Sequence, residues 1–266
     1  MSNRQHPNER DRKVLEIVAT AKWITHRQLA EIAKITGLEK NDNRKVFEWR
    51  VRRLSDLGLL KKQRPALLDR EILYSITKNG ILRLETMGVH PLSLAFDRDE
   101  PETTHHIPHS LEMNRIRIAL LRACTVARWL PDSAIRVLRK AGDQDYAKVY
   151  DAVATLVISS EVYRIGIEYE RSLKAIERYQ EIASKLADER GVQAVLYLCP
   201  NHETLTTISH VFFRATKTVI VAMMEDFVAN PLDGRAQVNV LTTSLRTELQ
   251  RISQQTTSTQ QRALVG

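Results

Sequence analysis

The sequence predicts an α+β protein in two parts, a helix-rich N-terminal part and a C-terminal part in which strands alternate with helices. Apolar residues recur at helical spacing three times before residue 58, and two short strand-like runs follow. Further along, residues 149–158 and 162–169 read as β-strands. The charge supports the same division, because the first 64 residues hold 16 Lys and Arg against 8 Asp and Glu, a surplus equal to the whole-chain net charge of +8.

The N-terminal part opens with three predicted helices. Residues 11–21 form the first, because their apolar side chains follow one face. Thr25 and Gln28 have the spacing of a capping box, in which each side chain satisfies a free backbone amide at the start of a helix. The second helix begins there and ends at Gly37, and the third spans residues 44–57.

The segment after the third helix indicates which kind of helix-turn-helix this is. Residues 59–64 and 71–76 are predicted as the two strands of a hairpin, and residues 77–87 as a fourth helix. Three helices, a hairpin and a further helix are the order of a winged helix-turn-helix. Such modules place their third helix in the major groove of DNA.

The third predicted helix separates apolar from charged side chains. One arc of its helical wheel carries the apolar residues Val46, Phe47, Val51, Leu54 and Leu57. The opposite arc is mostly cationic, as expected of a helix whose arginines pair with guanine while wing cations contact phosphates. The predicted DNA-binding residues are Thr25, Arg27, Arg44, Lys45, Glu48, Trp49, Arg52, Arg53, Lys61, Lys62 and Arg64. The alternative is a solvated cationic face, which is common on helices.

The rest of the chain alternates between helices and strands. Its predicted elements are a helix over 110–129, strands over 134–139, 149–158, 162–169, 192–198 and 217–223, and helices over 172–189 and 203–214. From about residue 246 the chain is rich in Gln, Thr and Ser. The predicted organisation is a DNA-binding domain over 1–90, a linker over 91–108, an α/β domain over 109–245 and a flexible tail over 246–266.

Three carboxylates are predicted to meet on the sheet of the α/β domain. Side chains alternate along a strand, so Glu168 and Glu170 share one face. Asp151 begins the preceding strand, and a hairpin of this length can place it opposite Glu168. Such a cluster could hold Mg²⁺, which favours hard oxygen ligands.

Several short motifs extend this picture. They are His109-x-Leu-x-x-Asn114, Asp151-Ala-Val153, Ile167-Glu-Tyr-Glu-Arg-Ser172 and Glu177-Arg-Tyr-Gln180. Together with the winged helix they resemble the replication-relaxation family of bacterial plasmids and mobile elements. That resemblance implies a winged helix joined to a restriction-endonuclease-like domain of the PD-(D/E)xK type, and a part in plasmid replication or mobilisation.

One position departs from the pattern of active nucleases of that fold. They carry a lysine two residues after the acidic residue, where this sequence has Glu170. A further carboxylate repels phosphate instead of stabilising it, although Lys174 in the next helix could compensate. If the domain is an active nuclease, the catalytic residues are Asp151, Glu168, Glu170 and Lys174, and the metal ligands are Asp151, Glu168 and Glu170.

The sequence therefore predicts a protein that binds double-stranded DNA in plasmid replication, mobilisation or transcriptional control, with a non-cleaving nuclease-like domain and no cofactor. The alternative is a metal-dependent DNA endonuclease, or nickase, that uses Mg²⁺. A homodimer and contacts with replication or mobilisation proteins are further expected partners. No apolar run approaches the roughly 18 to 20 residues of a membrane span, so no membrane partner and a cytoplasmic location are expected.

Overall fold

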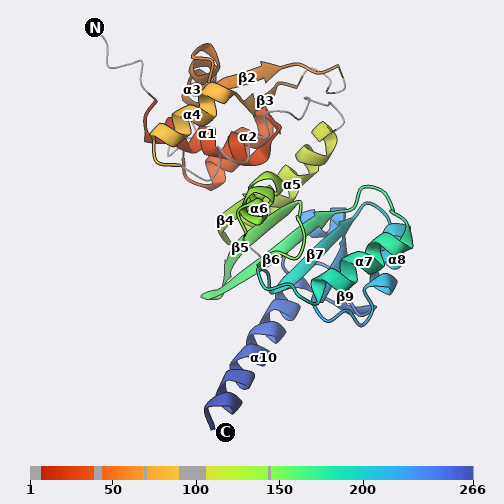
Figure 1. The fold of residues 1–266 in the computed structure, drawn as a ribbon. Helices are drawn as coiled ribbons and strands as arrows, with labels where there is room; N and C mark the ends of the chain where they lie inside the picture. Colours follow the sequence, from red (N-terminus) through yellow and green to blue (C-terminus); the bar gives the residue numbers. More distant parts are fainter. Residues whose placement is uncertain are drawn as a thin grey trace. The chain divides into compact units, whose positions relative to one another are not determined.

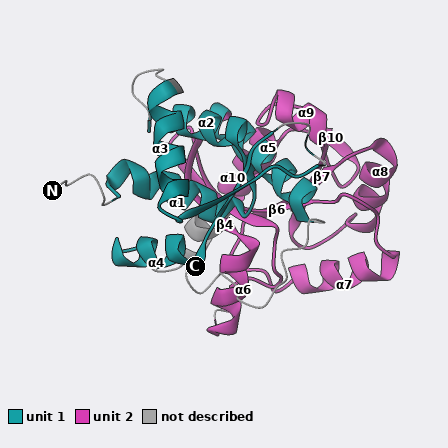
Figure 2. Cartoon of the chain, turned by 90° about the horizontal axis from the view of Figure 1, so that it is seen from above, with its two compact units in different colours: residues 1–122 teal, residues 123–266 magenta. Residues whose placement is uncertain are grey.

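The computed structural model describes residues 7–38, 44–66, 68, 71–89, 106–142 and 145–265. Arg44 and residues 256–265 are described by their backbone alone. The chain divides into two compact units, Met1–Arg122 and Ala123–Gly266 (Figure 2). Within the described residues, no helix is long and apolar enough to cross a membrane.

Unit 1 contains helices and a small sheet (Figure 1). Its elements are α1 (Glu9–Ala21), β1 (Ile24–Thr25), α2 (His26–Ile35), α3 (Arg44–Asp56), β2 (Leu60–Gln63), β3 (Leu73–Ile76), α4 (Lys78–Thr86) and α5 (Ile107–Ala123), whose last residue opens unit 2. The three strands pair antiparallel in the order β1-β3-β2. The predicted order of three helices, a hairpin and a helix is confirmed. Strand β1 was not predicted, because two residues are too few to show a period.

Local sequence signals begin the helices of unit 1. Capping boxes start α1 at Asn8 and α2 at Thr25, the second being the predicted pairing of Thr25 with Gln28. The apolar faces of these helices form one core, which includes Val14, Leu29, Val51, Leu54 and Leu84. Burial of these side chains stabilises the unit by removing apolar surface from water.

Helix α5 up to Arg122 belongs to unit 1, although the sequence assigned residues 109–122 to the second domain. The Asn114 side-chain amide donates to the Trp23 carbonyl at 2.7 Å, and the Gln28 amide donates to the Leu111 carbonyl at 2.9 Å. Ile118 joins the core of the unit. These contacts join segments 83 and 91 residues apart, which the sequence pattern does not reveal. Of the predicted linker, residues 91–105 lie outside the described residues.

Unit 2 is a mixed sheet with helices packed on it (Figure 1). Its elements are β4 (Thr125–Pro131), α6 (Asp132–Lys140), β5 (Ala152–Ile158), β6 (Glu161–Tyr169), α7 (Ile176–Leu186), β7 (Ala194–Cys199), α8 (His202–Val211), β8 (Thr218–Met223), α9 (Met224–Ala229), β9 (Ala236–Val238), β10 (Leu241–Thr243) and α10 (Leu245–Val265). The seven strands run in the order β10-β9-β8-β7-β6-β5-β4. Strands β6, β7 and β8 are parallel, and the other neighbouring pairs are antiparallel.

Two predictions between residues 110 and 140 are wrong. The helix predicted to reach residue 129 ends at Ala123, and strand β4 follows, paired antiparallel with β5. Residues 134–139 were predicted as a strand but belong to helix α6. Ala134 and Ile135 of this helix are buried, and its first and last turns carry charged residues. A short apolar run is compatible with a strand or with a helix. Here the segment forms a helix that packs against β4 and β5.

The C-terminal segment forms helix α10 where a flexible tail was predicted, and Figure 1 shows it extending from the sheet of unit 2. Leu245 and Leu249, one turn apart, are fully or almost fully buried. The Thr243 hydroxyl donates to the Glu248 carboxylate at 2.9 Å. These contacts anchor the first turns of a helix whose Gln- and Thr-rich sequence has little apolar periodicity of its own.

Candidate functional site

Helix α3 has an apolar face in the core and a cationic face outside it. Phe47, Val51 and Leu54 are buried as predicted, whereas Val46 and Leu57, which were predicted on the same apolar arc, are each 39% exposed. On the other side Lys45, Trp49 and Arg52 are exposed, and Glu48 is half-buried. The side chain of Arg44 lies outside the described residues.

Two arginines of α3 bind a buried carboxylate on α1. Asp11 is fully buried, and its Oδ1 accepts from Arg50 Nη1 at 3.0 Å. Its Oδ2 accepts from Arg53 Nη2 and, at 2.7 Å, from the Asn8 backbone amide of the α1 cap. Arg53 was predicted as a DNA contact, but here its guanidinium fixes α3 to α1. Neither Asp11 nor Arg50 was singled out in the sequence, because their pairing joins segments 39 residues apart.

Thr25 was also predicted as a DNA contact, and its place in the structure argues against that role. Thr25 is 5% exposed, and its hydroxyl accepts from the Gln28 backbone amide at 3.2 Å as the cap of α2. The hydroxyl is therefore committed to the helix terminus. Arg27, one residue into α2, is exposed.

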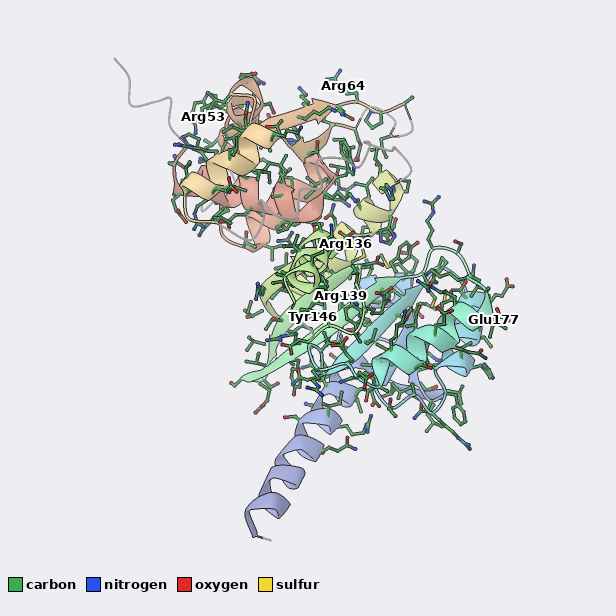
Figure 3. All side chains as sticks on the ribbon, viewed as in Figure 1. Arg53, Arg64, Arg136, Arg139, Tyr146 and Glu177 are labelled. Carbon is green, nitrogen blue, oxygen red and sulfur yellow. The ribbon has the colours of Figure 1, made fainter. Side chains whose placement is uncertain are left out.

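The predicted cations of the hairpin are all exposed. Lys61 and Lys62 lie on β2, and Arg64 directly follows that strand, which packs against α3. Figure 3 labels Arg53 at α3 and Arg64 at the hairpin of unit 1. We give the name reading surface to the predicted DNA-binding residues that are exposed on α3, on β2 and directly after β2, which are Lys45, Trp49, Arg52, Lys61, Lys62 and Arg64.

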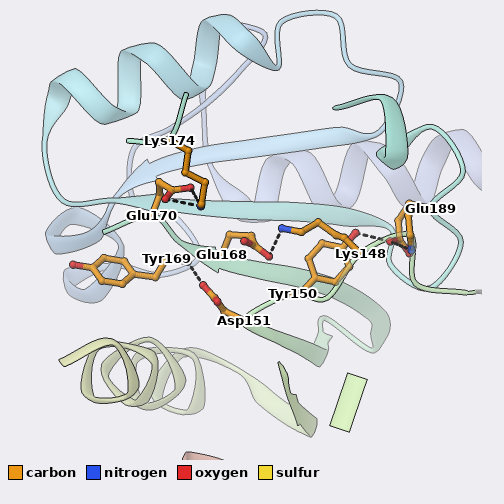
Figure 4. A network of polar contacts seen from close by, with 9 residues as sticks. Lys148, Tyr150, Asp151, Glu168, Tyr169, Glu170, Lys174 and Glu189 are labelled. Carbon is orange, nitrogen blue, oxygen red and sulfur yellow. Dashed lines mark hydrogen bonds and ion pairs between the residues drawn. The ribbon is translucent and has the colours of Figure 1, made fainter. Parts of the chain in front are cut away.

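The three predicted carboxylates lie at one end of β5 and β6 (Figure 4). Ala152 pairs with Ile167 across these strands, which brings Asp151 and Glu168 to the same end of the pair. Asp151 Oδ2 accepts from the Tyr169 backbone amide at 2.9 Å. We call Asp151, Glu168 and Glu170 the carboxylate cluster.

A lysine ammonium group is bound to each of the two glutamates of the carboxylate cluster. Lys174 Nζ lies 2.7 and 2.6 Å from the two carboxylate oxygens of Glu170, so the predicted reach of Lys174 towards this site is present. Lys148 Nζ lies 2.6 Å from Glu168 Oε1. Lys148 was not predicted, because its only signal in the sequence was its position three residues before Asp151, in a segment without periodicity.

Burial controls the protonation of this site. Glu168 is 8% exposed, and burial raises its pKa to about 7; nearby Asp151 adds to the rise and Lys148 opposes it. Burial also raises the pKa of the Tyr197 phenol well above its ordinary value. The Tyr197 hydroxyl is buried and has no hydrogen-bond partner in the described part of the chain. The site is thus a desolvated environment that disfavours the charged form of Glu168.

Glu189, which was not predicted from the sequence either, fixes the segment that carries Lys148. Its Oε2 accepts from the Tyr150 hydroxyl at 2.5 Å and from the Ala147 amide at 2.9 Å. Its Oε1 accepts from the amides of Gly191 at 2.7 Å and Val192 at 3.2 Å. Four donors on two loops therefore converge on one buried carboxylate, and they hold residues 147–150 beside the sheet.

As they lie, these residues do not fit Mg²⁺. The two glutamates are bound to lysine ammonium groups, and Asp151 holds a backbone amide of β6. Within the described ranges, no three His, Cys, Asp or Glu side chains are placed to hold one metal ion. The predicted ligands Asp151, Glu168 and Glu170 therefore share one end of the strands without converging on a metal position.

Comparisons with known proteins give distant structural similarity alone. No protein-family model matches the chain, and no curated protein matches it. The chain is similar to the restriction endonuclease FokI bound to DNA, with 12% identity and a TM-score of 0.24 over 83% of this chain and 43% of FokI. A second FokI structure gives 13% identity and a TM-score of 0.24, with 86% and 45% of the two chains covered. The chain thus spans less than half of the FokI chains, and TM-scores of this size do not define a common fold.

Proposed function

We propose that this protein binds double-stranded DNA through the reading surface of unit 1, which acts as a winged helix. The observation that carries the proposal is the division of α3 into a buried apolar face and an exposed face with Lys45, Trp49 and Arg52. The apolar face already satisfies the packing of the helix. The cationic face lies outside this packing and has the charge that attracts a polyanion.

The expected division of labour follows from the chemistry of each side chain. Arg52 is suited to reading the major groove, where a guanidinium can bond to both guanine acceptors. Lys61, Lys62 and Arg64 on the hairpin are suited to phosphates, which fix the register of a protein on the duplex without reading its sequence. If the cationic face of α3 were only a solvated surface, there would be no reason for both the helix and the adjoining strand to carry exposed cations.

For unit 2 we propose a nuclease-like domain that does not cleave DNA. Active nucleases of that kind need carboxylates free to hold a divalent cation, and here Glu168 and Glu170 are bound to Lys148 and Lys174.

The biological setting comes from the resemblance to the replication-relaxation family. On that basis we infer a protein of a bacterial plasmid or mobile element that acts in replication, mobilisation or transcriptional control at its bound site. Winged-helix proteins often bind two half-sites as dimers, so a homodimer on DNA is part of the proposal.

Replacing Lys45 and Arg52 together by alanine is expected to weaken DNA binding and to flatten its salt dependence. Each lost phosphate contact lowers the slope of log affinity against log salt by about one, and each lost guanine contact weakens binding by about 1–3 kcal/mol. The measurement is a titration of labelled duplex at several salt concentrations. Arg178→Ala, which removes an exposed arginine of unit 2, is the matched control and should leave both quantities unchanged. Unchanged affinity and slope in the double variant would contradict the proposed reading surface.

Incubation of the protein with supercoiled plasmid and Mg²⁺ or Mn²⁺ is expected to produce no nicked or linear DNA. The reason is that the ammonium groups of Lys148 and Lys174 hold the carboxylates that a metal would need. Glu168→Ala serves as the control for contaminating nucleases. Nicking by the natural protein that disappears in this variant would establish the endonuclease alternative instead.

A further inference from the structure

Helix α3 exposes two apolar side chains, Trp49 among the exposed cations and Val46 at the border between the cationic and the apolar face. Trp49 is 56% exposed, and Val46, three residues earlier and so on the same side of the helix, is 39% exposed. The core already takes Phe47, Val51 and Leu54 from this helix, each 4% exposed or less. Trp49 and Val46 therefore form an apolar patch outside the core, with exposed Lys45 and Arg52 beside it in the sequence.

The ring of Trp49 is held in place by Arg53, which is itself bound to a buried carboxylate of unit 1. The guanidinium carbon of Arg53, one turn further along α3, lies 5.3 Å from the centre of the Trp49 ring. Arg53 is bound to the buried carboxylate of Asp11, which also accepts from Arg50 and from the cap of α1. A continuous series of contacts thus runs from the start of α1 to an exposed indole. A side chain held in this way loses less conformational entropy on binding than a free one.

We propose that Trp49 packs against thymine C5-methyl groups in the major groove and gives this protein a preference for thymine at the positions it contacts. The partner of this patch must be apolar at its centre and anionic at its edges, because Lys45 and Arg52 accompany the indole. The major groove has this chemistry, since the thymine methyl group is its apolar feature and phosphates border it. The inference rests on the proposed DNA binding and adds the base that the surface prefers.

The test compares thymine with uracil in duplexes that the full chain selects from a random-sequence pool. Deoxyuridine in place of thymidine removes the methyl group and nothing else. For the natural protein, we expect an affinity loss of about fourfold at each contacted thymine, as burial of one methyl-sized group contributes about 0.8 kcal/mol. Trp49→Ala should bind the thymine duplex more weakly and no longer distinguish it from the uracil duplex. Leu82→Ala, which removes an exposed apolar side chain of α4, should keep the discrimination.

The possible results separate this inference from the DNA binding on which it rests. Equal affinity for thymine and uracil at every position, or discrimination that persists in Trp49→Ala, overturns the role of Trp49 while DNA binding stands. Failure of the natural protein to retain any duplex near physiological salt overturns the proposed function and this inference together. Circular dichroism of Trp49→Ala checks that the exposed substitution leaves the fold intact.

Discussion

Asp11→Ala is expected to lower the free energy of unfolding of unit 1 by about 3–5 kcal/mol, the range for breaking a buried charge pair by removal of one partner. Asp11 is fully buried and binds the guanidinium groups of Arg50 and Arg53. The side chain of Arg50 is 6% exposed. Without Asp11, its charge stays buried but loses its carboxylate partner on α1. The α1 cap also loses the bond from the Asn8 amide. Hydrogen exchange resolved to α1 and α3 measures the change within unit 1.

Two variants make this measurement specific. Glu9→Ala removes an exposed carboxylate of the same helix, paired with Arg12, and should change stability little because exposed ion pairs contribute little. Asp11→Asn keeps an oxygen acceptor for the cap but removes the charge, so it should fall between the natural protein and Asp11→Ala. If Asp11→Ala loses no more protection than Glu9→Ala, the buried network does not hold α3 to α1.

Glu189→Ala is expected to lower the free energy of unfolding of unit 2 by at least about 4 kcal/mol, because hydrogen bonds to a charged group contribute about 1.5–3 kcal/mol each and several are lost together. The carboxylate is 4% exposed and accepts from the Tyr150 hydroxyl and three backbone amides. The substitution leaves all four donors without this acceptor and opens a cavity beside Tyr150. Chemical denaturation followed by circular dichroism measures the loss.

The matched control is Glu181→Ala, which removes an exposed glutamate of α7 paired with Arg178. It should leave the denaturation midpoint almost unchanged. Glu189→Gln should cost less than Glu189→Ala, since the amide oxygen can still accept some of these hydrogen bonds. A denaturation midpoint for Glu189→Ala equal to that of Glu181→Ala would contradict the structural role of Glu189.

The parts of the fold that the sequence predicted correctly are those with a clear local period. Helices α1 to α4 carry apolar stripes, capping residues begin α1, α2 and α4, and strands β5 and β6 carry runs of β-branched residues. Where the local signal fits two structures, the prediction failed. Residues 134–139 were expected as a strand and form part of α6, and residues 125–129 were expected as helix and lie in β4.

The candidate sites follow the same division. The exposed side chains of Lys45, Trp49 and Arg52 follow from the helical period of α3, so the sequence could place them on one face. Arg53 belongs to the same helical pattern, but its guanidinium binds the carboxylate of Asp11, which lies 42 residues away in the sequence. Lys148 belongs to no periodic pattern in the sequence, yet its ammonium group lies 2.6 Å from the carboxylate of Glu168.

By itself, the sequence determined the order of helices α1 to α3, the hairpin of β2 and β3 and helix α4 in unit 1. It also determined the excess positive charge near the N-terminus and the presence of Asp151, Glu168 and Glu170 at the ends of two adjoining strands. The tertiary structure alone decided which charges are paired, which are buried and which remain exposed. The physical reason is that secondary structure depends on periodicity over a few residues, whereas ion pairing and desolvation depend on distances between groups that are remote in the chain.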